Sequence, residues 1–229
     1  MLVYGKNVAK ELLTSNQNIK KIYLIENFND TQILSLLKDK NVIVNSKKQM
    51  DKKVSGLHQG IILEIDDFEY TDLDNILKEE NPLIVILDHI EDPHNLGAII
   101  RTCEAAKVDG IIIPKNRCAN INSTVMKTSA GALQNVKITM VTNLSATIKK
   151  LKKQGFWFIG TDMDGTSYKD IDYNGKTCII VGNEGFGMAH LIKEQCDFIA
   201  SIPMKGKVNS LNASVAAGII IFEAVTNRK

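Results

Sequence analysis

The sequence predicts an α/β protein with a small amino-terminal domain and a larger domain built on a mostly parallel sheet. Strand-like and helix-like patterns alternate along the chain, which favours βαβ units. Beyond residue 82 the strand patterns are continuous apolar runs, which are typical of strands buried on both faces of a parallel sheet. An acidic, polar stretch at about residues 67–82 separates the two halves and has the composition of a linker.

The composition is that of an ordinary globular protein. The chain has 229 residues, of which 44% are apolar and 24% charged, and a net charge of only +2. Because this charge is small, the composition gives no sign of a dedicated nucleic-acid binder, and any RNA partner would have to be recognised by local basic patches. The four cysteines form no C-x-x-C pair, and the chain has no signal-peptide pattern or long apolar run. We therefore expect a cytoplasmic protein with reduced thiols and no membrane span.

The first domain is predicted at residues 1–72. Helical and strand patterns alternate in it, and Asp30 is placed to cap the second helix. Six lysines add positive charge. The helices are expected at 5–16, 30–40 and 47–54, the strands at 20–26, 41–45 and 60–66, and the lysines are Lys20, Lys21, Lys47, Lys48, Lys52 and Lys53.

The second domain is predicted at residues 73–229. The expected strands are 83–88, 110–114, 136–141, 156–162, 177–182 and 198–203, and the expected helices are Leu96–Ala106, Ser123–Leu133, Ser145–Gln154, Met188–Gln195 and Asn212–Thr226. The last helix is apolar nearly all round, so it must be buried on every face. Its own sheet or a homodimer interface would provide that burial.

Three polar loops follow strands of this second domain, at 89–97, 182–187 and 204–212. Ligands bind at the carboxyl ends of parallel strands, so these loops are expected to form one site. Their candidate residues also have structural explanations: Asn95, Ser210 and Asn212 are potential helix caps, and Arg101 is either a surface residue or the partner of Glu104. Together, however, the amide, hydroxyl, carboxylate and guanidinium groups of three loops favour a site.

Two other interpretations of these loops are weaker. The stretch "GNEGFG" follows a strand, but its spacing is not that of a dinucleotide-binding turn, and no acidic residue ends a strand about 20 residues later. A metal site would need Asp88, His89, Glu91, Asp92 and His94, whose spacing matches no helical ligand pair. We therefore expect no metal.

With their flanking residues, the three loops resemble the motifs of the SpoU-type RNA ribose 2′-O-methyltransferases of the SPOUT superfamily. These segments are "LDHIEDPHNLGAIIRTCEAA", "IIVGNEGFGM" and "IPMKGKVNSLNASVAAGIIIFEA", and "STVMKTSAGALQNVKI" looks like a further family stretch. The segments "VYGKNVAKELL" and "SGLHQGI" resemble the L30e-like RNA-binding domain of the subgroup that methylates a guanosine of 23S rRNA. Glycine is usual in the family at the position of Lys107.

This resemblance implies a carboxyl-terminal trefoil knot, an S-adenosylmethionine cofactor, an RNA substrate and a homodimer. The implied cofactor-binding residues are Thr161, Gly182, Gly187, Ile202, Met204, Leu211 and Ala213, and the implied catalytic residues are Asn95, Arg101, Glu184, Ser210 and Asn212. Arg101 would act either as the general base or, given the high pKa of a guanidinium, as a clamp on a phosphate. Alternatives are a tRNA guanosine 2′-O-methyltransferase and a non-catalytic ribosome-assembly factor.

Overall fold

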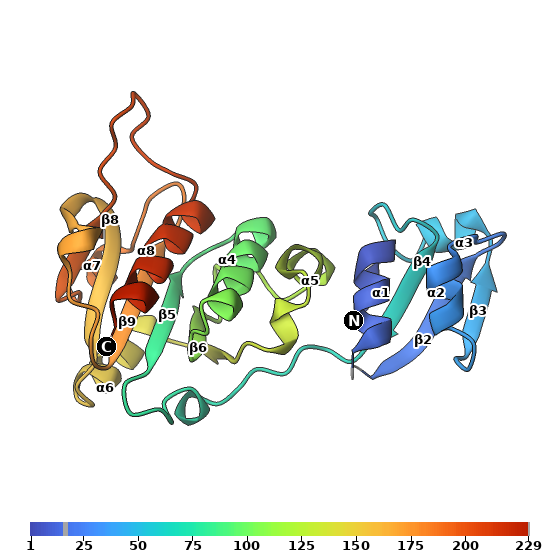
Figure 1. The fold of residues 1–229 in the computed structure, drawn as a ribbon, viewed down its shortest axis with the longest axis horizontal. Helices are drawn as coiled ribbons and strands as arrows, with labels where there is room; N and C mark the ends of the chain where they lie inside the picture. Colours follow the sequence, from blue (N-terminus) through green and yellow to red (C-terminus); the bar gives the residue numbers. More distant parts are fainter. Residues whose placement is uncertain (16–17, 229) are drawn as a thin grey trace. The chain divides into compact units, whose positions relative to one another are not determined.

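The computed structural model describes residues 1–15 and 18–228, which form two compact units (Figure 1). Unit 1 comprises Met1–Glu69 and Ile121–Gly131, and unit 2 comprises Tyr70–Asn120 and Ala132–Lys229. The return of 121–131 to unit 1 was not predicted, since these residues follow the second domain's first strands. Asn16, in the first predicted helix, and Lys229, the end of the second predicted domain, lie outside the described residues.

Unit 1 is a four-stranded sheet with short helices. Its strand order is β1-β4-β2-β3, in which β2 and β3 are parallel and the other pairs antiparallel. The strand β1 was not predicted, because three residues are too few to show a period. The elements are β1 (Leu2–Tyr4), α1 (Lys6–Thr14), β2 (Ile19–Ile25), α2 (Thr31–Leu36), β3 (Val42–Asn45), α3 (Lys47–Asp51), β4 (Ile61–Ile65) and α5 (Ser123–Ser129).

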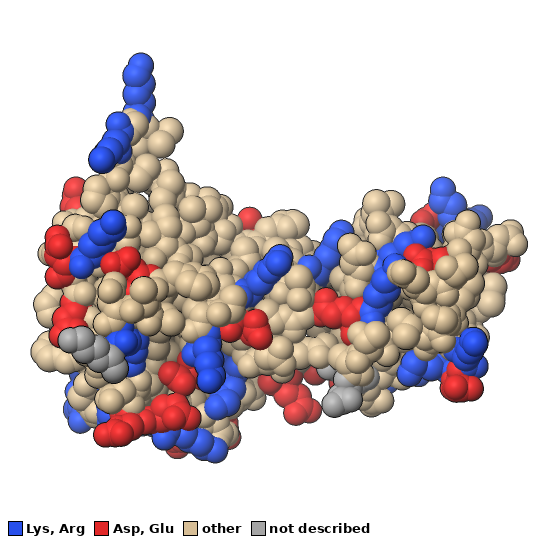
Figure 2. Space-filling view, viewed as in Figure 1, with Lys and Arg blue, Asp and Glu red and all other residues tan. Residues whose placement is uncertain are grey.

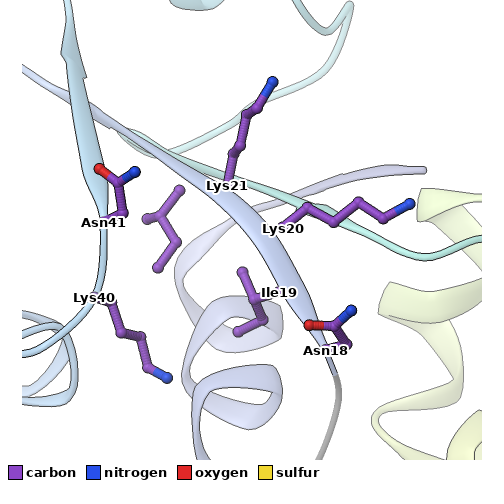
Figure 3. A pocket seen from close by; sticks show the side chains of 7 residues that line it. Asn18, Ile19, Lys20, Lys21, Lys40 and Asn41 are labelled. Carbon is purple, nitrogen blue, oxygen red and sulfur yellow. The ribbon is translucent and has the colours of Figure 1, made fainter.

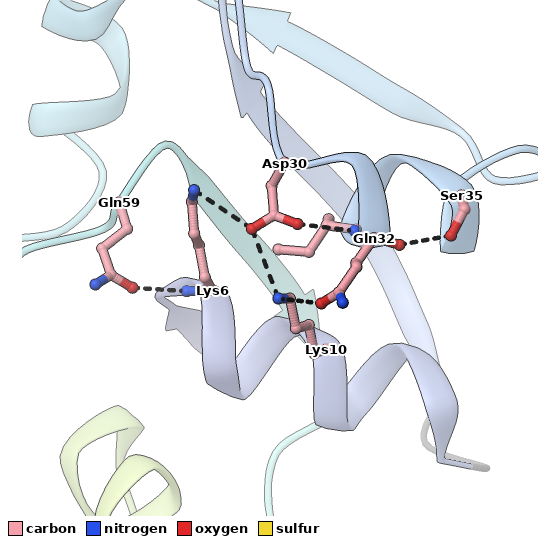
Figure 4. Close-up of polar contacts among 7 residues, drawn as sticks. Lys6, Lys10, Asp30, Gln32, Ser35 and Gln59 are labelled. Carbon is pink, nitrogen blue, oxygen red and sulfur yellow. Dashed lines mark hydrogen bonds and ion pairs between the residues drawn. The ribbon is translucent and has the colours of Figure 1, made fainter.

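A polar cluster ties α1 to α2 in unit 1 (Figure 4). The predicted cap is confirmed: Asp30 accepts a hydrogen bond from the Ile33 N–H at 3.2 Å. Its carboxylate also lies 3.4 Å from the Lys6 ammonium and 3.6 Å from that of Lys10. The Ile33 N–H and the two lysines hold the pKa of Asp30 below its ordinary value. These two lysines are therefore partly neutralised within the protein.

Unit 2 confirms the predicted six-stranded parallel sheet. The strand order is β10-β8-β9-β5-β6-β7, and every neighbouring pair is parallel. Its elements are η1 (Leu73–Asn75), β5 (Leu83–Asp88), α4 (Pro93–Ala105), β6 (Gly110–Pro114), η2 (Ala132–Gln134), β7 (Ile138–Val141), α6 (Leu144–Lys152), β8 (Trp157–Ser167), η3 (Tyr168–Asp170), β9 (Thr177–Gly182), α7 (His190–Lys193), β10 (Phe198–Ser201) and α8 (Ala213–Asn227). The trefoil knot stays a prediction.

Helices cover both faces of this sheet. Alternate strand residues, including Ile84, Ile112 and Phe158, join a core cluster with residues of α6 and α7. The residues between them, such as Val85 and Ile159, are equally buried, so they face the opposite side, where α4 packs on β6 and α8 on β9. Burial on both faces explains the continuous apolar runs in the sequence.

Several predicted element ends were wrong. The helix predicted at Leu96–Ala106 begins at Pro93, because Asp92 caps it by accepting from the His94 N–H at 2.9 Å. The helix predicted at Ser123–Leu133 ends at Ser129, where Ala130 takes a left-handed conformation. The helix predicted at Met188–Gln195 is the four-residue α7, and the strand predicted to end at Asp162 continues to Ser167.

Within the single chain the last helix is not buried on every face, and its burial by a homodimer interface stays a prediction. Its residues Ala217, Ile220, Ile221 and Ala224 are at most 1% exposed, whereas Val215, Phe222 and Val225 are 50%, 47% and 37% exposed. One stripe of α8 therefore packs in unit 2 and another stays uncovered. In the described part of the chain, no helix combines the length and apolarity needed to cross a membrane.

Lys107 occupies a helix-ending position that favours glycine. Its φ is +53°, and α4 ends in a Schellman motif: the Lys107 N–H donates to Glu104 O and the Val108 N–H to Cys103 O, both at 2.9 Å. A side chain at such a φ costs about 1 kcal/mol. We expect Lys107→Gly to raise the free energy of unfolding by about that amount in urea titrations. Lys107→Ala keeps the Cβ and should give no gain, so equal stability of the two variants would contradict this account.

Candidate active site

A cavity of about 750 Å³ lies at the carboxyl edge of the unit 2 sheet. Its walls come from the middle of β8, the ends of β9 and β10, the loops that follow β9 and β10, and the first turns of α8. This is the edge at which the three polar loops were expected to meet.

An irregularity in β8 builds one wall of the cavity. Gly160 pairs with Ile199 of β10, but the next pair joins Thr166 to Ala200, so residues 161–165 are looped out of the ladder. Thr161, Asp162, Met163 and Asp164 of this bulge line the cavity. The Ser201 hydroxyl closes the bulge by donating to Gly165 O at 3.0 Å. A strand-like sequence carries no signal for such a bulge, which explains why it was missed.

The structure places all seven expected cofactor-binding residues on the wall of this cavity: Thr161, Gly182, Gly187, Ile202, Met204, Leu211 and Ala213. At Gly182 the turn folds back so tightly that a Cβ would lie 2.4 Å from backbone atoms of Gly187 and Met188. Asn183 and Gly187 pair across this turn by two backbone hydrogen bonds of 3.0 and 2.9 Å. Glycine at 182 is therefore required for the close approach of the chain.

Three of the expected catalytic residues form a chain of hydrogen bonds. The Asn95 side-chain amide donates to Glu184 Oε1, and the Asn212 Nδ2 donates to Asn95 Oδ1 at 2.9 Å. Asn95 itself is only 7% exposed. Asn95 of the first loop thus joins one side chain from each of the other two loops, which lie 89 and 117 residues away in sequence.

Asn95 and Asn212 were both potential helix caps, and only Asn212 is one. Asn95 is not the cap of α4, because Asp92 has that role. Asn212 does cap α8, since its Oδ1 accepts from the Ser214 N–H at 2.9 Å and the Val215 N–H at 3.3 Å. Its amide nitrogen nevertheless reaches Asn95, so a single side chain serves both purposes.

The other two candidates stand apart from this chain. Ser210 lines the cavity and is exposed. Arg101 is an exposed residue on α4; within the described residues its guanidinium has no ion pair with Glu104 and no hydrogen bond to the three joined residues. The structure of one chain therefore does not bring Arg101 to Asn95, Glu184 and Asn212.

Sequence reasoning missed the side chains that hold two of the loops together. The Asp88 carboxylate is fully buried; it pairs with His89 Nδ1 at 2.5 Å and accepts from the Ala189 N–H at 2.6 Å. Asn183 donates to His89 O at 2.8 Å and accepts from the Gly185 N–H at 2.8 Å. Asp88 and His89 had been considered only as metal ligands. No group of three or more metal-binding side chains occurs among the described residues.

The cavity wall is acidic. Asp162, Asp164 and Glu184 line it, and no lysine or arginine of the described chain does. Partial burial alone would raise the pKa of Asp162, but the Lys193 ammonium, 2.6 Å away, holds that pKa below its ordinary value. Asp162 is therefore ionised at neutral pH, but Lys193 balances its charge. Asp164 and Glu184 form no ion pair with another described residue, so these two carboxylates favour a ligand that carries positive charge.

The four cysteines are free and lie in unit 2. Burial raises the pKa of each thiol, to about 12 for Cys118 and Cys196 and further for Cys103 and Cys178. At pH 8 we expect iodoacetamide to leave the native thiols unmodified while the urea-denatured chain reacts fully. Folding raises these pKa values above the ordinary 9.0. The protonated, buried thiols therefore contribute in full to the free energy of unfolding below pH 9, and this contribution is lost as the pH rises toward 12. Rapid labelling of the native protein would contradict this assignment.

A second hollow, in unit 1, is a weaker candidate for a binding site. It is lined by Asn18, Ile19, Lys20, Lys21, Ile22, Lys40 and Asn41. Figure 3 shows that the amino groups of the three lysines point away from one another. Lys20 also pairs with Asp66 at 2.6 Å and Lys21 lies 4.0 Å from Glu64. The three ammonium groups therefore do not converge on one position where they could bind an anion together.

Comparison with known proteins gives two family matches. The SpoU rRNA Methylase family matches residues 82–222, and the family described as RNA 2'-O ribose methyltransferase substrate binding matches residues 2–71. Together they cover most of the chain.

Individual relatives agree with these matches. The chain is 39% identical to YacO of Bacillus subtilis over 99% of its own length and 95% of that protein, whose name places it with the TrmH family tRNA/rRNA methyltransferases. It is 41% identical to a similarly named protein of Staphylococcus haemolyticus over its whole length and 96% of that protein. Its fold is similar to the SpoU methyltransferase AviRb of Streptomyces viridochromogenes, crystallised with AdoMet, with a TM-score of 0.82, 24% identity and coverage of 99% and 89% of the two chains.

Proposed function

Because the chain belongs to the SpoU rRNA methylase family of RNA methyltransferases, we propose that it transfers the methyl group of S-adenosylmethionine to a ribose 2′-hydroxyl of RNA. The observation that carries this proposal is the Asn95–Glu184–Asn212 chain of hydrogen bonds, whose Glu184 also lines the 750 Å³ cavity. The proposed site for the methyl donor therefore lies next to a polar site for the ribose that accepts the methyl group.

The cavity suits S-adenosylmethionine in size, lining and charge. Its volume falls within the range of small-molecule sites. Ile202, Leu211 and Ile220 offer apolar contact to the adenine, and the tight turn at Gly182 presents backbone groups to its edge. The carboxylates of Asp164 and Glu184, which form no ion pair with another described residue, complement a cationic sulfonium and ammonium. When bound, the cofactor supplies an electrophilic methyl group.

The protein's own task is to orient the ribose and assist loss of its proton. A ribose hydroxyl is a weak acid, so alignment with the methyl group and stabilisation of the developing oxyanion lower the barrier. We assign the amides of Asn95 and Asn212, with Glu184, to a rigid polar platform, and the Ser210 hydroxyl to the acceptor side. Arg101, exposed on α4, is assigned to the acceptor nucleotide, either as base or as phosphate clamp.

The finer proposal is a guanosine of 23S rRNA as substrate. The match of residues 2–71 to a substrate-binding family supports recognition of RNA by unit 1. Its α3 exposes Lys47 and Lys48, and Lys52 follows that helix; these exposed lysines form no ion pair with another described residue and attract phosphates. The alternatives are a guanosine of tRNA and a non-catalytic role in ribosome assembly. Reduced thiols and an RNA substrate are consistent with action in the cytoplasm.

We also propose a homodimer, in which a second copy covers the uncovered stripe of α8. Val215, Phe222 and Val225 are the exposed apolar residues of this stripe. The same helix contributes Ala213, Ala216 and Ile220 to the cavity, so a second copy on α8 lies beside the site. Sedimentation should give a mass of twice 25.4 kDa.

Two measurements, made one after the other, test the proposed activity. Calorimetry with S-adenosylmethionine should show one site per chain, and tritiated methyl should then pass to unmodified 23S rRNA transcript rather than to tRNA transcript. Binding without transfer to either RNA would favour the assembly-factor alternative, and transfer to tRNA alone would overturn the substrate assignment.

A further inference from the structure

The segment between β10 and α8, residues 202–212, is a projecting loop (Figure 1). All residues from Pro203 to Ser210 are exposed. The loop is anchored at its ends: Ser201 bonds to the β8 bulge, and Asn212 caps α8 and reaches Asn95. Nothing lies within 4 Å of a Cβ built on Gly206, so the middle of the loop is not packed.

Most residues of this loop line the cavity, but its two lysines do not. Met204, Gly206 and Val208 line the cavity, whereas Lys205 and Lys207 do not. Ile202, Pro203 and residues 209–211 also line the cavity, and the chain bends at Gly206 and Lys207. The loop therefore has an inner face toward the cofactor site and an outer face that carries two lysines.

The outer face is positively charged without internal compensation. Lys205 and Lys207 form no ion pair within the described residues, whereas Lys152 and Lys193 of the same unit each lie 2.6 Å from a carboxylate. Figure 2 shows lysine or arginine side chains at the tip of this projection, apart from acidic ones. Two uncompensated ammonium groups in water are well suited to an anionic partner.

We propose that the outer face of the 202–212 loop binds phosphate groups of the RNA strand beside the acceptor ribose. This inference rests on the proposed function, which places the ribose at Ser210 and Asn212 of the same loop. Lys207 is three residues from Ser210, a span of at most about 10 Å. A nucleotide whose ribose is at Ser210 therefore has neighbouring phosphates within reach of these side chains.

The geometry favours the phosphates of RNA over the carboxylate of the cofactor as the anion. Both lysines are absent from the cavity wall, which carries three carboxylates instead. The two sources predict different results: lysines that hold RNA affect RNA affinity and its dependence on salt, whereas lysines that hold the cofactor affect cofactor affinity.

The test compares two double variants of the full chain by filter binding to a labelled, unmodified 23S rRNA transcript. Lys205→Ala/Lys207→Ala should weaken binding at least about 10-fold at physiological salt. It should also reduce the slope of log Kd against log salt by roughly 1.4 to 1.8, the effect of two lost phosphate contacts. Affinity for S-adenosylmethionine, measured by calorimetry, should stay within about twofold of the wild-type value because the cavity wall is unchanged.

The matched control is Lys149→Ala/Lys153→Ala. Both residues are exposed at the carboxyl-terminal end of α6, which leads to the start of β8 at the opposite edge of the sheet. The control variant removes the same amount of positive charge as the loop variant. RNA affinity and salt slope equal to those of this control would overturn the proposal, as would weaker cofactor binding by the loop variant alone. If the wild type binds RNA without transferring methyl, the proposed function fails, but the comparison of RNA affinities still decides the role of the loop.

Discussion

Asn95→Ala is expected to lower kcat for methyl transfer by at least about 100-fold, the usual effect of removing one oriented donor from a polar site. Asn95 is the central member of the hydrogen-bond chain, because it donates to Glu184 and accepts from Asn212. Its loss removes the side-chain link of the first loop to Glu184 and to Asn212, while the bond from Asn183 to His89 O remains. Single-turnover transfer of tritiated methyl to 23S rRNA transcript measures the effect on chemistry apart from product release.

Asn143→Ala is the matched control for this substitution. Asn143 caps α6 by accepting from the Ala146 N–H at 3.0 Å and does not line the cavity. Its replacement should cost about 1 kcal/mol of stability and leave kcat unchanged. If Asn95→Ala keeps its melting temperature and its cofactor affinity yet transfers methyl within about threefold of the wild-type rate, the hydrogen-bond chain is not part of the active site.

Arg101→Ala is expected to reduce turnover by a similar factor, at least about 100-fold. The guanidinium is exposed and is not part of the core, so the melting temperature should change little. Affinity for S-adenosylmethionine should also be preserved, since Arg101 does not line the cavity. The loss should therefore appear in kcat and in RNA affinity alone.

Arg101→Lys separates the two roles considered for this residue. A lysine loses its proton at a lower pH than a guanidinium, so a base role predicts partial recovery of kcat as the pH rises toward 10. A planar, bidentate clamp on phosphate cannot be replaced by a single ammonium, so that role predicts no recovery at any pH. Wild-type kcat for Arg101→Ala would exclude both roles.

The fold class and the convergence of the loops were predictable because both follow from local patterns. Continuous apolar strands that alternate with helices require a parallel sheet, and such a sheet places the loops after β5, β9 and β10 at one edge. Features that depend on contacts distant in sequence were not predictable. They include the packing of residues 121–131 in unit 1 and the bulge at 161–165.

The site itself was predicted by residue type more fully than by geometry. Asn95 and Asn212 are residues that also cap helices, and only the coordinates distinguish a cap from a partner of Glu184. The hydrogen bond from Asn183 to His89 O could not be predicted from the sequence, because a side-chain bond to a backbone carbonyl 94 residues away leaves no local pattern. For Arg101 the sequence left a surface position and a pair with Glu104 open, and only the coordinates show that it is exposed.

Locating the transferred methyl group tests the central claim most directly. Purified protein would be incubated with tritiated S-adenosylmethionine and unmodified 23S rRNA transcript, and the RNA digested to nucleosides for chromatography and mass spectrometry. Convergence of the three loops on a ribose predicts that the label elutes as 2′-O-methylguanosine from one position. Label on a base, or RNA that stays unlabelled although the protein binds both reactants, would contradict the account.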